Sequence, residues 1–433
     1  MSAIEACPAP VIAPPLDPGL GAELVGAATG PDPYPLYRRL QRDYPIADLF
    51  GAVSVFCYAD VATVLRHPQV SADDRNSALH QSFADAGRLA PAYLSQLDDQ
   101  SFLHRDPPDH TRLRKLVASA FTPGRVEALR PFIQQFVNTI LDAAADRGRM
   151  EVVAELAWPL PIAVVCELLG IPITDREFVA TWPRIQLCCS FEPGTLKTAA
   201  ELESGPPDRQ AEADRIQGQL TNYFAGLIEE RRAHARDDLV SALLVPQENG
   251  ERLSTEELNA TLRLLFVAGY ENTVNLIGHG TLALLRHPDQ WAGLRDDPTL
   301  VRGAVDEALR YDAPFQFTRR VALADLDIRG YQVQRGQHII CWLAAANRDP
   351  DEFDEPDRFD IRRSPNRHLG FGAGMHACLG GPLATMQAEI AFTSLTRRLV
   401  QPRLEADAPR YRDDVFHSLA ELPIAFEAVR PVA

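Results

Sequence analysis

The segment from Phe371 to Gly380 constrains this chain more than any other part of its sequence. It presents one cysteine, Cys378, on a glycine-rich loop, and a helix-like run from Pro382 to Ile390 follows directly. Gly372 and Gly374 can adopt positive φ and direct backbone N–H groups at the sulfur. Those donors, with the N-terminal end of the following helix, favour the thiolate form. The pattern predicts a shielded thiolate that binds a metal, with a structural cysteine in a tight turn as the alternative.

The composition argues against several classes of protein. The chain has 433 residues, of which 46% are hydrophobic, and a net charge of −16. This hydrophobic fraction is sufficient for a sizeable core, and the acidic balance argues against nucleic acid as a partner. The seven cysteines show no regular spacing, which is typical of a reduced, cytoplasmic protein. Because no window is apolar over the thickness of a bilayer, we expect no membrane partner.

The hydrophobic periodicity predicts a mainly α-helical chain with a minor β component. Residues 1–30 begin with an Ala- and Pro-rich stretch and are expected to form a flexible leader, whereas no linker divides residues 31–433, which predicts one domain. Ser254 and Glu257 form a capping box that opens a long helix extending to about Arg286. Further helices are expected at 31–43, 111–121, 126–145, 151–170, 212–236 and 298–311, and strands at 53–58, 326–329 and 338–343.

Glu307 and Arg310 lie three residues apart, on one face of a predicted helix. This spacing is common in surface ion pairs, which is the alternative interpretation. The neighbouring Val305 and Leu309 make the helix apolar and favour a buried pair. A buried pair of this kind fixes one geometry more reliably than it adds stability, so its predicted role is structural.

The cysteine loop resembles the haem-thiolate loop of the cytochrome P-450 family, written Phe-Gly-x-Gly-x-x-x-Cys-x-Gly, and every fixed position is met. Glu307 and Arg310, about seventy residues earlier, resemble the Glu-x-x-Arg pair that locks the core beneath the haem in this family. The resemblance covers about residues 31 to 425 and implies a triangular helical prism with small β-sheets. It implies haem b as the cofactor, with Cys378 as the iron ligand and Phe371, Gly372 and Gly380 beside the haem.

The resemblance also indicates which groups hold the haem propionates. His110 and Arg114, four residues apart on one helix face, match a family pair that binds a propionate. For these two residues the alternative is a solvated charged face. Arg320 matches the arginine that follows the buried-pair helix, and His368, three residues before Phe371, matches a further propionate ligand.

Residues 268–273 resemble the oxygen-activation segment of the family. Gly269 in mid-helix costs about 1 kcal/mol relative to alanine, which is understandable if the helix must part to admit dioxygen. Glu271 is expected to relay protons. The family usually places threonine after this acid, but here Asn272 takes that position and Thr273 follows, about 100° further round the helix. Asn272 then marks altered proton delivery, unless it merely packs or contacts the substrate.

The implied reaction is activation of dioxygen, followed by hydroxylation, epoxidation or oxidative coupling of an apolar organic molecule, as in secondary metabolism. A haem protein that binds a ligand without turnover and a peroxide-driven oxidase are the alternatives. Gly269 and Glu271 argue against the first, and the family's peroxide users tend to carry an Arg-Pro pair where this chain has Glu271 and Asn272. The substrate pocket is expected to include Ala268, Tyr270, Phe315, Gln316, Phe317 and Phe416.

The electrons must come from other chains, because the sequence has no flavin or nicotinamide fingerprint and no ferredoxin cysteine cluster. We therefore expect ferredoxin and ferredoxin reductase as partners. By analogy with the family, several basic residues flank the cysteine face and could dock an acidic ferredoxin, with scattered solvated charges as the alternative. They are Arg112, Lys115, Arg358, Arg362, Arg363 and Arg367.

Overall fold

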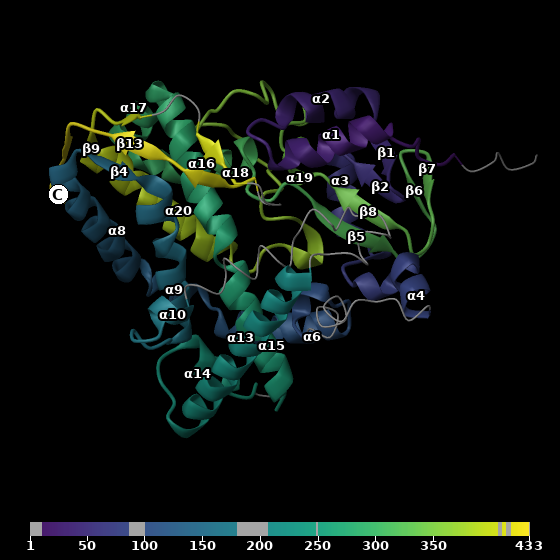
Figure 1. Cartoon of the computed structure of the whole chain (residues 1–433), viewed down its shortest axis with the longest axis horizontal. Coiled ribbons are helices and arrows are strands. Elements are labelled where there is room, and N and C mark those ends of the chain that lie inside the picture. The colour runs from purple at the N-terminus through teal and green to yellow at the C-terminus, as the bar shows by residue number, and fades with distance from the viewer. Residues whose placement is uncertain are drawn as a thin grey trace, which may run out of the picture.

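Helices dominate the fold, and the small sheets lie on more than one side of it (Figure 1). The structure, a computed structural model, describes residues 11–85, 100–179, 207–247, 250–405, 409–412 and 417–432. In Figure 1 the largest sheet and the purple N-terminal helices occupy the right of the molecule, and long helices fill its left and lower parts. The prediction of a mainly α-helical chain with a minor β component is confirmed. The prediction that residues 31–433 form one domain stays a prediction.

The largest sheet has five strands in the order β1, β2, β8, β5, β3. Strands β2 and β8 pair in parallel, and the other neighbours are antiparallel. Because side chains alternate between the two faces of a strand, Ile339 packs into one hydrophobic cluster and Ile340 into another. The strands are Ile46–Leu49 (β1), Ala52–Val55 (β2), Val70–Ser71 (β3), Thr318–Ala322 (β5) and His338–Cys341 (β8).

The first described helix, α1 (Pro18–Thr29), corrects the expectation of a flexible leader. The Asp17 side chain accepts a hydrogen bond from the backbone N–H of Leu20 and caps the helix. Leu20 and Leu24 are buried in one of the clusters against the sheet. The leader prediction is therefore wrong for these residues, because their apolar face packs against the domain. Residues 1–10 lie outside the described part of the chain.

The expected long helix is two helices, α15 (Thr255–Ala268) and α16 (Glu271–Arg286), which are separated at residues 269–270. The capping box at the start of α15 is confirmed. A Cβ atom on Gly269 would lie 2.9 Å from the Leu265 carbonyl oxygen and 3.0 Å from Val165 Cγ2. Glycine at this position therefore allows the chain to turn close against its neighbours, and the prediction of one continuous helix is wrong here.

The main hydrophobic cluster surrounds α16, whose residues are buried along almost its whole length. The other helices are α2 (Tyr34–Asp43), α3 (Tyr58–Arg66), α4 (Ala78–Asp85), α6 (Asp109–Ala120), α7 (Pro123–Glu127), α8 (Arg130–Ala144), α9 (Pro159–Leu169), α10 (Arg176–Val179), α13 (Pro207–Ala233), α14 (Leu239–Leu244), α17 (Pro288–Asp296), α18 (Val301–Tyr311), α19 (Leu343–Ala346) and α20 (Gly381–Arg398). The other strands are β4 (Arg149–Glu151), β6 (Leu326–Ile328), β7 (Tyr331–Val333), β9 (Leu399–Val400), β10 (Arg403–Leu404), β11 (Arg410–Tyr411), β12 (Leu419–Glu421), β13 (Pro423–Ala425) and β14 (Ala428–Val429).

The contact between α16 and α20 leaves no space for an added methyl group. A Cβ atom on Gly280 would lie 2.1 Å from Cζ of Phe392. We expect Gly280→Ala to lower the free energy of unfolding by about 1–3 kcal/mol, because the ring must shift within a packed core. Gly226→Ala on α13 is the control, since nothing lies within 4 Å of its added Cβ atom. Chemical denaturation of both variants tests the prediction, and an unchanged Gly280→Ala midpoint would contradict it.

Candidate functional site

The cysteine loop is held in a single shape by its glycines. Gly372 and Gly374 have φ of 66° and 72°, in the left-handed region that favours glycine. A Cβ atom on Gly374 would lie 2.2 Å from the carbonyl oxygen of Leu65, so the loop lies directly against the end of α3. The Cys378 N–H donates to the carbonyl oxygen of Phe371 at 2.9 Å and closes the loop.

The thiol of Cys378 is accessible to solvent, yet the protein atoms around it still desolvate it. Burial raises the pKa of this thiol, and the backbone N–H groups of Gly380 and Gly381 oppose the rise, together with the Arg114 guanidinium. The expected N–H donors are therefore present, but they come from the residues that begin α20. Gly372 and Gly374 instead shape the loop.

Helix α6 brings two of the predicted propionate ligands to this loop. Arg114 Nη2 donates to the carbonyl oxygen of Ala377 at 2.6 Å, directly beside Cys378. The His110 ring lies 4.2 Å from the ring of His376, measured between centroids. Burial lowers the pKa of His376 to about 3, and Arg320, His110 and Arg114 add to this effect. The structure thus gathers donor groups from three distant segments.

This group of donors fits the carboxylates of a haem. In the described part of the chain, Nε2 of His110 and Nε2 of His376 are buried and have no hydrogen-bond partner. Burial also lowers the pKa of Arg114 and of Arg320, so both guanidinium groups are desolvated. Buried donors without acceptors are costly, and two propionates would satisfy them. The residues present therefore fit the predicted cofactor.

His368 is not part of this group. Its Nε2 lies 3.5 Å from Oδ1 of Asp306, and its Nδ1 accepts a hydrogen bond from the Gly370 N–H at 3.1 Å. Both ring nitrogens of His368 therefore already have neighbours, Asp306 and the Gly370 N–H. The structure brings His376 to the predicted ligands instead, which the sequence analysis missed. The available signal was its position two residues before the cysteine.

Glu307 and Arg310 form the predicted buried pair, with both side chains fully buried. Arg310 donates through Nε and Nη2 to the two carboxylate oxygens, each at 2.8 Å. Arg363 Nε also donates to Glu307, at 3.1 Å. Arg363 therefore belongs to the interior network, and its expected place in a docking surface is wrong. Arg112 and Arg358 are paired with Glu257 and Glu355 respectively, whereas the remaining candidates, Lys115, Arg362 and Arg367, are exposed.

The turn between α15 and α16 places the oxygen-activation residues on different faces. Ala268, the last residue of α15, is exposed, and Asn272 on α16 is partly exposed although its neighbours on that helix are buried. In the part of the chain that the structure describes, Asn272 Oδ1 has no hydrogen-bond partner. The Thr273 hydroxyl donates to the carbonyl oxygen of Gly269 at 3.3 Å and so satisfies a backbone group that the break exposes.

Glu271 is buried at the start of α16 and is paired with the C-terminal region of the chain. Arg412 Nη1 donates to Glu271 Oε1 at 2.8 Å, and the hydroxyl of Ser418 donates to the same oxygen at 3.3 Å. Asn275 Nδ2 donates in turn to Ser418 Oγ at 3.0 Å. The sequence analysis identified Glu271 but neither of its partners.

Comparisons with known proteins decide the identity of this fold and site. The profile of the cytochrome P-450 family matches residues 52–401. This chain belongs to the cytochrome P-450 family. The resemblance seen in the sequence is confirmed, as are the helical prism with small sheets, the monooxygenase class and the cofactor, haem b held by the Cys378 thiolate.

The relatives are similar over three quarters of the chain or more. The cytochrome P-450 monooxygenase PikC of Streptomyces venezuelae is 38% identical over 425 residues, which cover 95% of each protein. The polyketide biosynthesis cytochrome P-450 PksS of Bacillus subtilis is 39% identical over 327 residues, covering 75% of this chain and 77% of that protein. The crystal structure of Mycobacterium smegmatis CYP164A2 with econazole bound has a TM-score of 0.83 at 38% identity, and covers 94% of this chain and 99% of that chain.

Two residues expected in the substrate pocket of this cytochrome P-450, Tyr270 and Gln316, are buried, and a third, Phe317, is partly buried. Tyr270 is fully buried, and its ring packs edge-to-face on Trp158 with centroids 4.6 Å apart. Gln316 is buried, where it accepts a hydrogen bond from the Tyr37 hydroxyl at 2.8 Å. Phe317 packs on Trp342, with ring centroids 5.0 Å apart. The predictions for Tyr270 and Gln316 are wrong, because both side chains are buried against partners in the core, whereas the prediction for the partly buried Phe317 stays a prediction.

The pocket predictions for Ala268, Phe315 and Phe416 stay predictions. Ala268 is exposed and Phe315 is partly buried, so both remain candidates for substrate contact. Phe416 lies outside the described residues. Among the helices that the structure describes, none has the length and apolar character needed to cross a bilayer.

The placement of His376 leads to a testable difference from His368. We expect His376→Ala to accelerate haem loss by about tenfold, because a buried propionate would lose one of its partners. His368→Ala, which removes an equal side chain engaged by Asp306, is the matched control and should retain haem as the wild type does. Transfer of haem to an apo-globin acceptor measures both rates. Equal haem loss in the two variants would contradict the assignment.

Proposed function

We propose that this cytochrome P-450 hydroxylates, epoxidises or oxidatively couples an apolar organic molecule in secondary metabolism. It acts in the cytoplasm and receives electrons from a separate ferredoxin and ferredoxin reductase. The observation that carries the proposal is the meeting of Cys378 with the buried donors of His110, Arg114 and His376. The relative from polyketide biosynthesis supports the metabolic setting.

The residues of this site divide the work of holding the cofactor. When bound, the haem supplies the iron chemistry that activates dioxygen, and the protein supplies position, protons and exclusion of water. Cys378 binds the iron through its sulfur, and the N–H groups that oppose its raised pKa stabilise the thiolate. The propionates are held by His110, Arg114, Arg320 and His376.

Glu271 is the proton-carrying group of the proposed reaction. Its carboxylate is held by Arg412 and Ser418, so it must exchange these contacts, or pass its proton through water, to serve the accessible face of the helix. Asn272 is partly exposed on that face, and its Oδ1, which is buried and has no hydrogen-bond partner in the described residues, can accept a hydrogen bond from a group that reaches it. The Thr273 hydroxyl donates a hydrogen bond to the Gly269 carbonyl oxygen, so it is less suited than Asn272 to bind water or substrate.

The iron ligand is tested by spectroscopy. We expect the reduced, carbon-monoxide-bound protein to show the absorption band typical of thiolate ligation, and Cys378→His to move that band to the histidine position, because imidazole donates less electron density. Cys166→Ser, a change at a buried cysteine on α9, is the control and should keep the thiolate band. A Cys378→His protein with the wild-type band would refute the assignment.

The role of Asn272 is tested by restoring the usual hydroxyl. We expect Asn272→Thr to lower the product formed per reducing equivalent by about threefold or to change the product, because the amide is part of the proton path. The measurement compares the amount of product formed from the native substrate with the number of reducing equivalents consumed. A marked rise in coupling with an unchanged product would show that the asparagine has no specialised role.

Turnover assays separate the proposed function from its alternatives. Product formed with ferredoxin and its reductase, and little with hydrogen peroxide, supports the monooxygenase. The reverse result supports a peroxide-driven oxidase, and ligand binding without product supports a carrier. Screening a library of apolar compounds by difference spectroscopy provides the substrate class on which these assays depend.

A further inference from the structure

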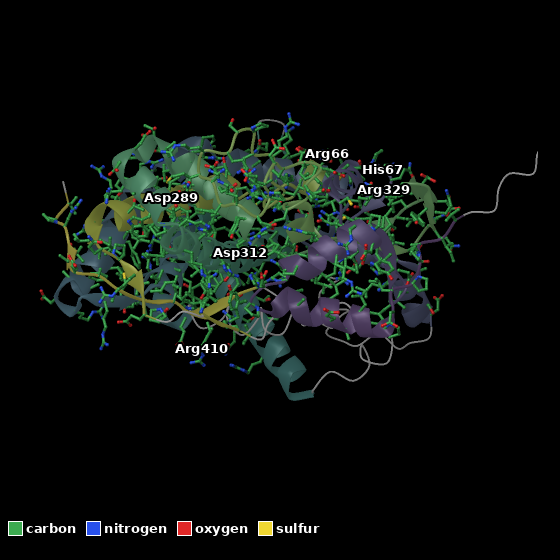
Figure 2. All side chains as sticks on the ribbon, turned by 90° about the horizontal axis from the view of Figure 1, so that it is seen from above. Arg66, His67, Asp289, Asp312, Arg329 and Arg410 are labelled. Carbon is green, nitrogen blue, oxygen red and sulfur yellow. The ribbon has the colours of Figure 1, made fainter. Side chains whose placement is uncertain are left out.

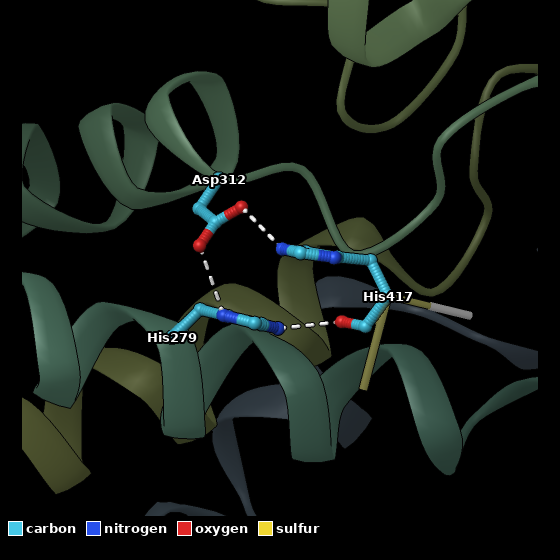
Figure 3. Close-up of side chains that lie close together, drawn as sticks. All are labelled: His279, Asp312 and His417. Atoms are coloured by element: carbon cyan, nitrogen blue, oxygen red, sulfur yellow. Dashed lines mark hydrogen bonds and ion pairs between the residues drawn. The ribbon is translucent and has the colours of Figure 1, made fainter. Parts of the chain in front are cut away.

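Away from the haem site, two buried histidines and a partly buried aspartate meet at the side of α16 (Figure 3). Nδ1 of His279 lies 3.0 Å from Oδ2 of Asp312, and Nε2 of His417 lies 3.1 Å from the other oxygen of the same carboxylate. The second nitrogen of His279, Nε2, lies 2.6 Å from the backbone oxygen of His417. One carboxylate thus joins a helix to the C-terminal region. In Figure 2 Asp312 lies within the body of the molecule, whereas Arg410 lies at its edge.

This cluster is one end of a polar stripe on α16. Glu271, Asn275 and His279 are spaced four residues apart, so they lie on the same helical face. Each of them contacts residues 417–418: Glu271 and Asn275 bond to the Ser418 hydroxyl, and His279 bonds to the preceding carbonyl. The C-terminal segment is therefore laid along the helix, with the acid of the proposed reaction at one end and the cluster at the other.

A metal ion is the first alternative for such a cluster, because its three ligand atoms lie within 4.8 Å of one another. A metal binds an imidazole nitrogen in the plane of the ring, at about 2.0–2.1 Å for zinc. The two imidazole rings are stacked, with planes only 5° from parallel and centroids 4.9 Å apart. Stacked parallel planes do not meet at a shared ion. Asp312 Oδ1 also accepts the Tyr34 hydroxyl at 2.9 Å, which suits a hydrogen-bonded carboxylate.

The charges of the cluster support a direct attraction between its members. Burial alone would raise the pKa of Asp312, but His279 and His417 together hold it well below its usual range. Burial likewise opposes a charge on His279, yet Asp312 raises the pKa of that imidazole above its ordinary value. A carboxylate between two imidazoles in the interior holds them firmly, because a buried charge without its partner is costly.

We propose that His279, Asp312 and His417 form a clamp that fixes the C-terminal segment on α16 and thereby positions Glu271. The three are positioning residues, which act on Glu271 through the Ser418 hydroxyl and Arg412. The inference rests on the proposed function of Glu271 as proton carrier. Without the clamp the segment shifts, the carboxylate loses its fixed partners, and electrons from the reductase end in hydrogen peroxide released to solution instead of product.

The test uses the haem-loaded enzyme and Asp312→Asn, which keeps the shape of the carboxyl group but removes its charge. We expect product per reducing equivalent to fall about fivefold, with haem content and the carbon-monoxide band unchanged. His287→Gln is the matched control, because His287 follows the last residue of the same helix and its Nδ1 bonds to the carbonyl of Ala283, away from Asp312. It should couple as the wild type does.

A double-variant cycle distinguishes positioning from general loss of structure. If Asp312 acts through Glu271, then Asp312→Asn adds no further uncoupling to Glu271→Gln. If the double variant loses coupling by the product of the two single-variant factors, the two residues act independently and the clamp is overturned. If Glu271→Gln alone leaves coupling unchanged, the proposed proton role has failed. If only Asp312→Asn leaves coupling unchanged, the clamp has failed and the proton role stands.

Two further measurements keep the inference falsifiable. Should Asp312→Asn fail to retain haem, His279→Gln replaces it, since the glutamine amide can keep the bond to the His417 carbonyl while it loses the link to Asp312. When it is combined with Glu271→Gln, His279→Gln must likewise cause no further loss of product per reducing equivalent. Elemental analysis of the wild-type enzyme should find no metal other than iron in stoichiometric amount. A second metal that is lost in a His417→Ala variant would overturn the clamp in favour of a metal site.

Discussion

The buried ion pair of Glu307 and Arg310 fixes the segment on which the haem site depends. Arg310 Nη1 donates to the carbonyl oxygens of Asn347 and Pro356, at 3.0 and 2.8 Å, while its other nitrogens hold the carboxylate. The Asn347 side chain then accepts the N–H of Leu369 at 2.7 Å. Buried charges cost several kcal/mol each unless every partner is in place. These bonds therefore fix the backbone at Leu369, two residues before the cysteine loop begins at Phe371.

Helix α16 links this site to the far side of the molecule. At its start the break at Gly269 leaves one face accessible, where Asn272 lies, and the Thr273 hydroxyl satisfies the freed carbonyl. Along its polar stripe, α16 carries buried side chains that need hydrogen-bond partners. Glu271 finds one in Arg412, and His279 finds one in the backbone of His417. One helix thus carries both the accessible face on which Asn272 lies and the contacts that hold Glu271, so it joins the C-terminal segment to that face.

The features that sequence predicted are those that depend on short spacing. The loop around Cys378, the Glu307–Arg310 pair and the capping box at Ser254 are set by residues within one or two turns of each other. Their geometry follows from local backbone preference, so the pattern is sufficient to predict it. The sequence predicted that the helix parts at Gly269 but still predicted one continuous helix, because the contact with Val165 that favours glycine there comes from another helix.

The features that sequence did not predict depend on partners brought together by the fold. Glu271 is held by Arg412 and Ser418, which are 141 and 147 residues away along the chain. Two histidines near Phe371 look equivalent as haem ligands, but Asp306 engages one of them and leaves the other, His376, facing α6. Residue type selects what a side chain can bind, whereas packing decides which of its potential partners is within reach. The donors that the fold leaves unsatisfied are therefore the candidates for holding a propionate.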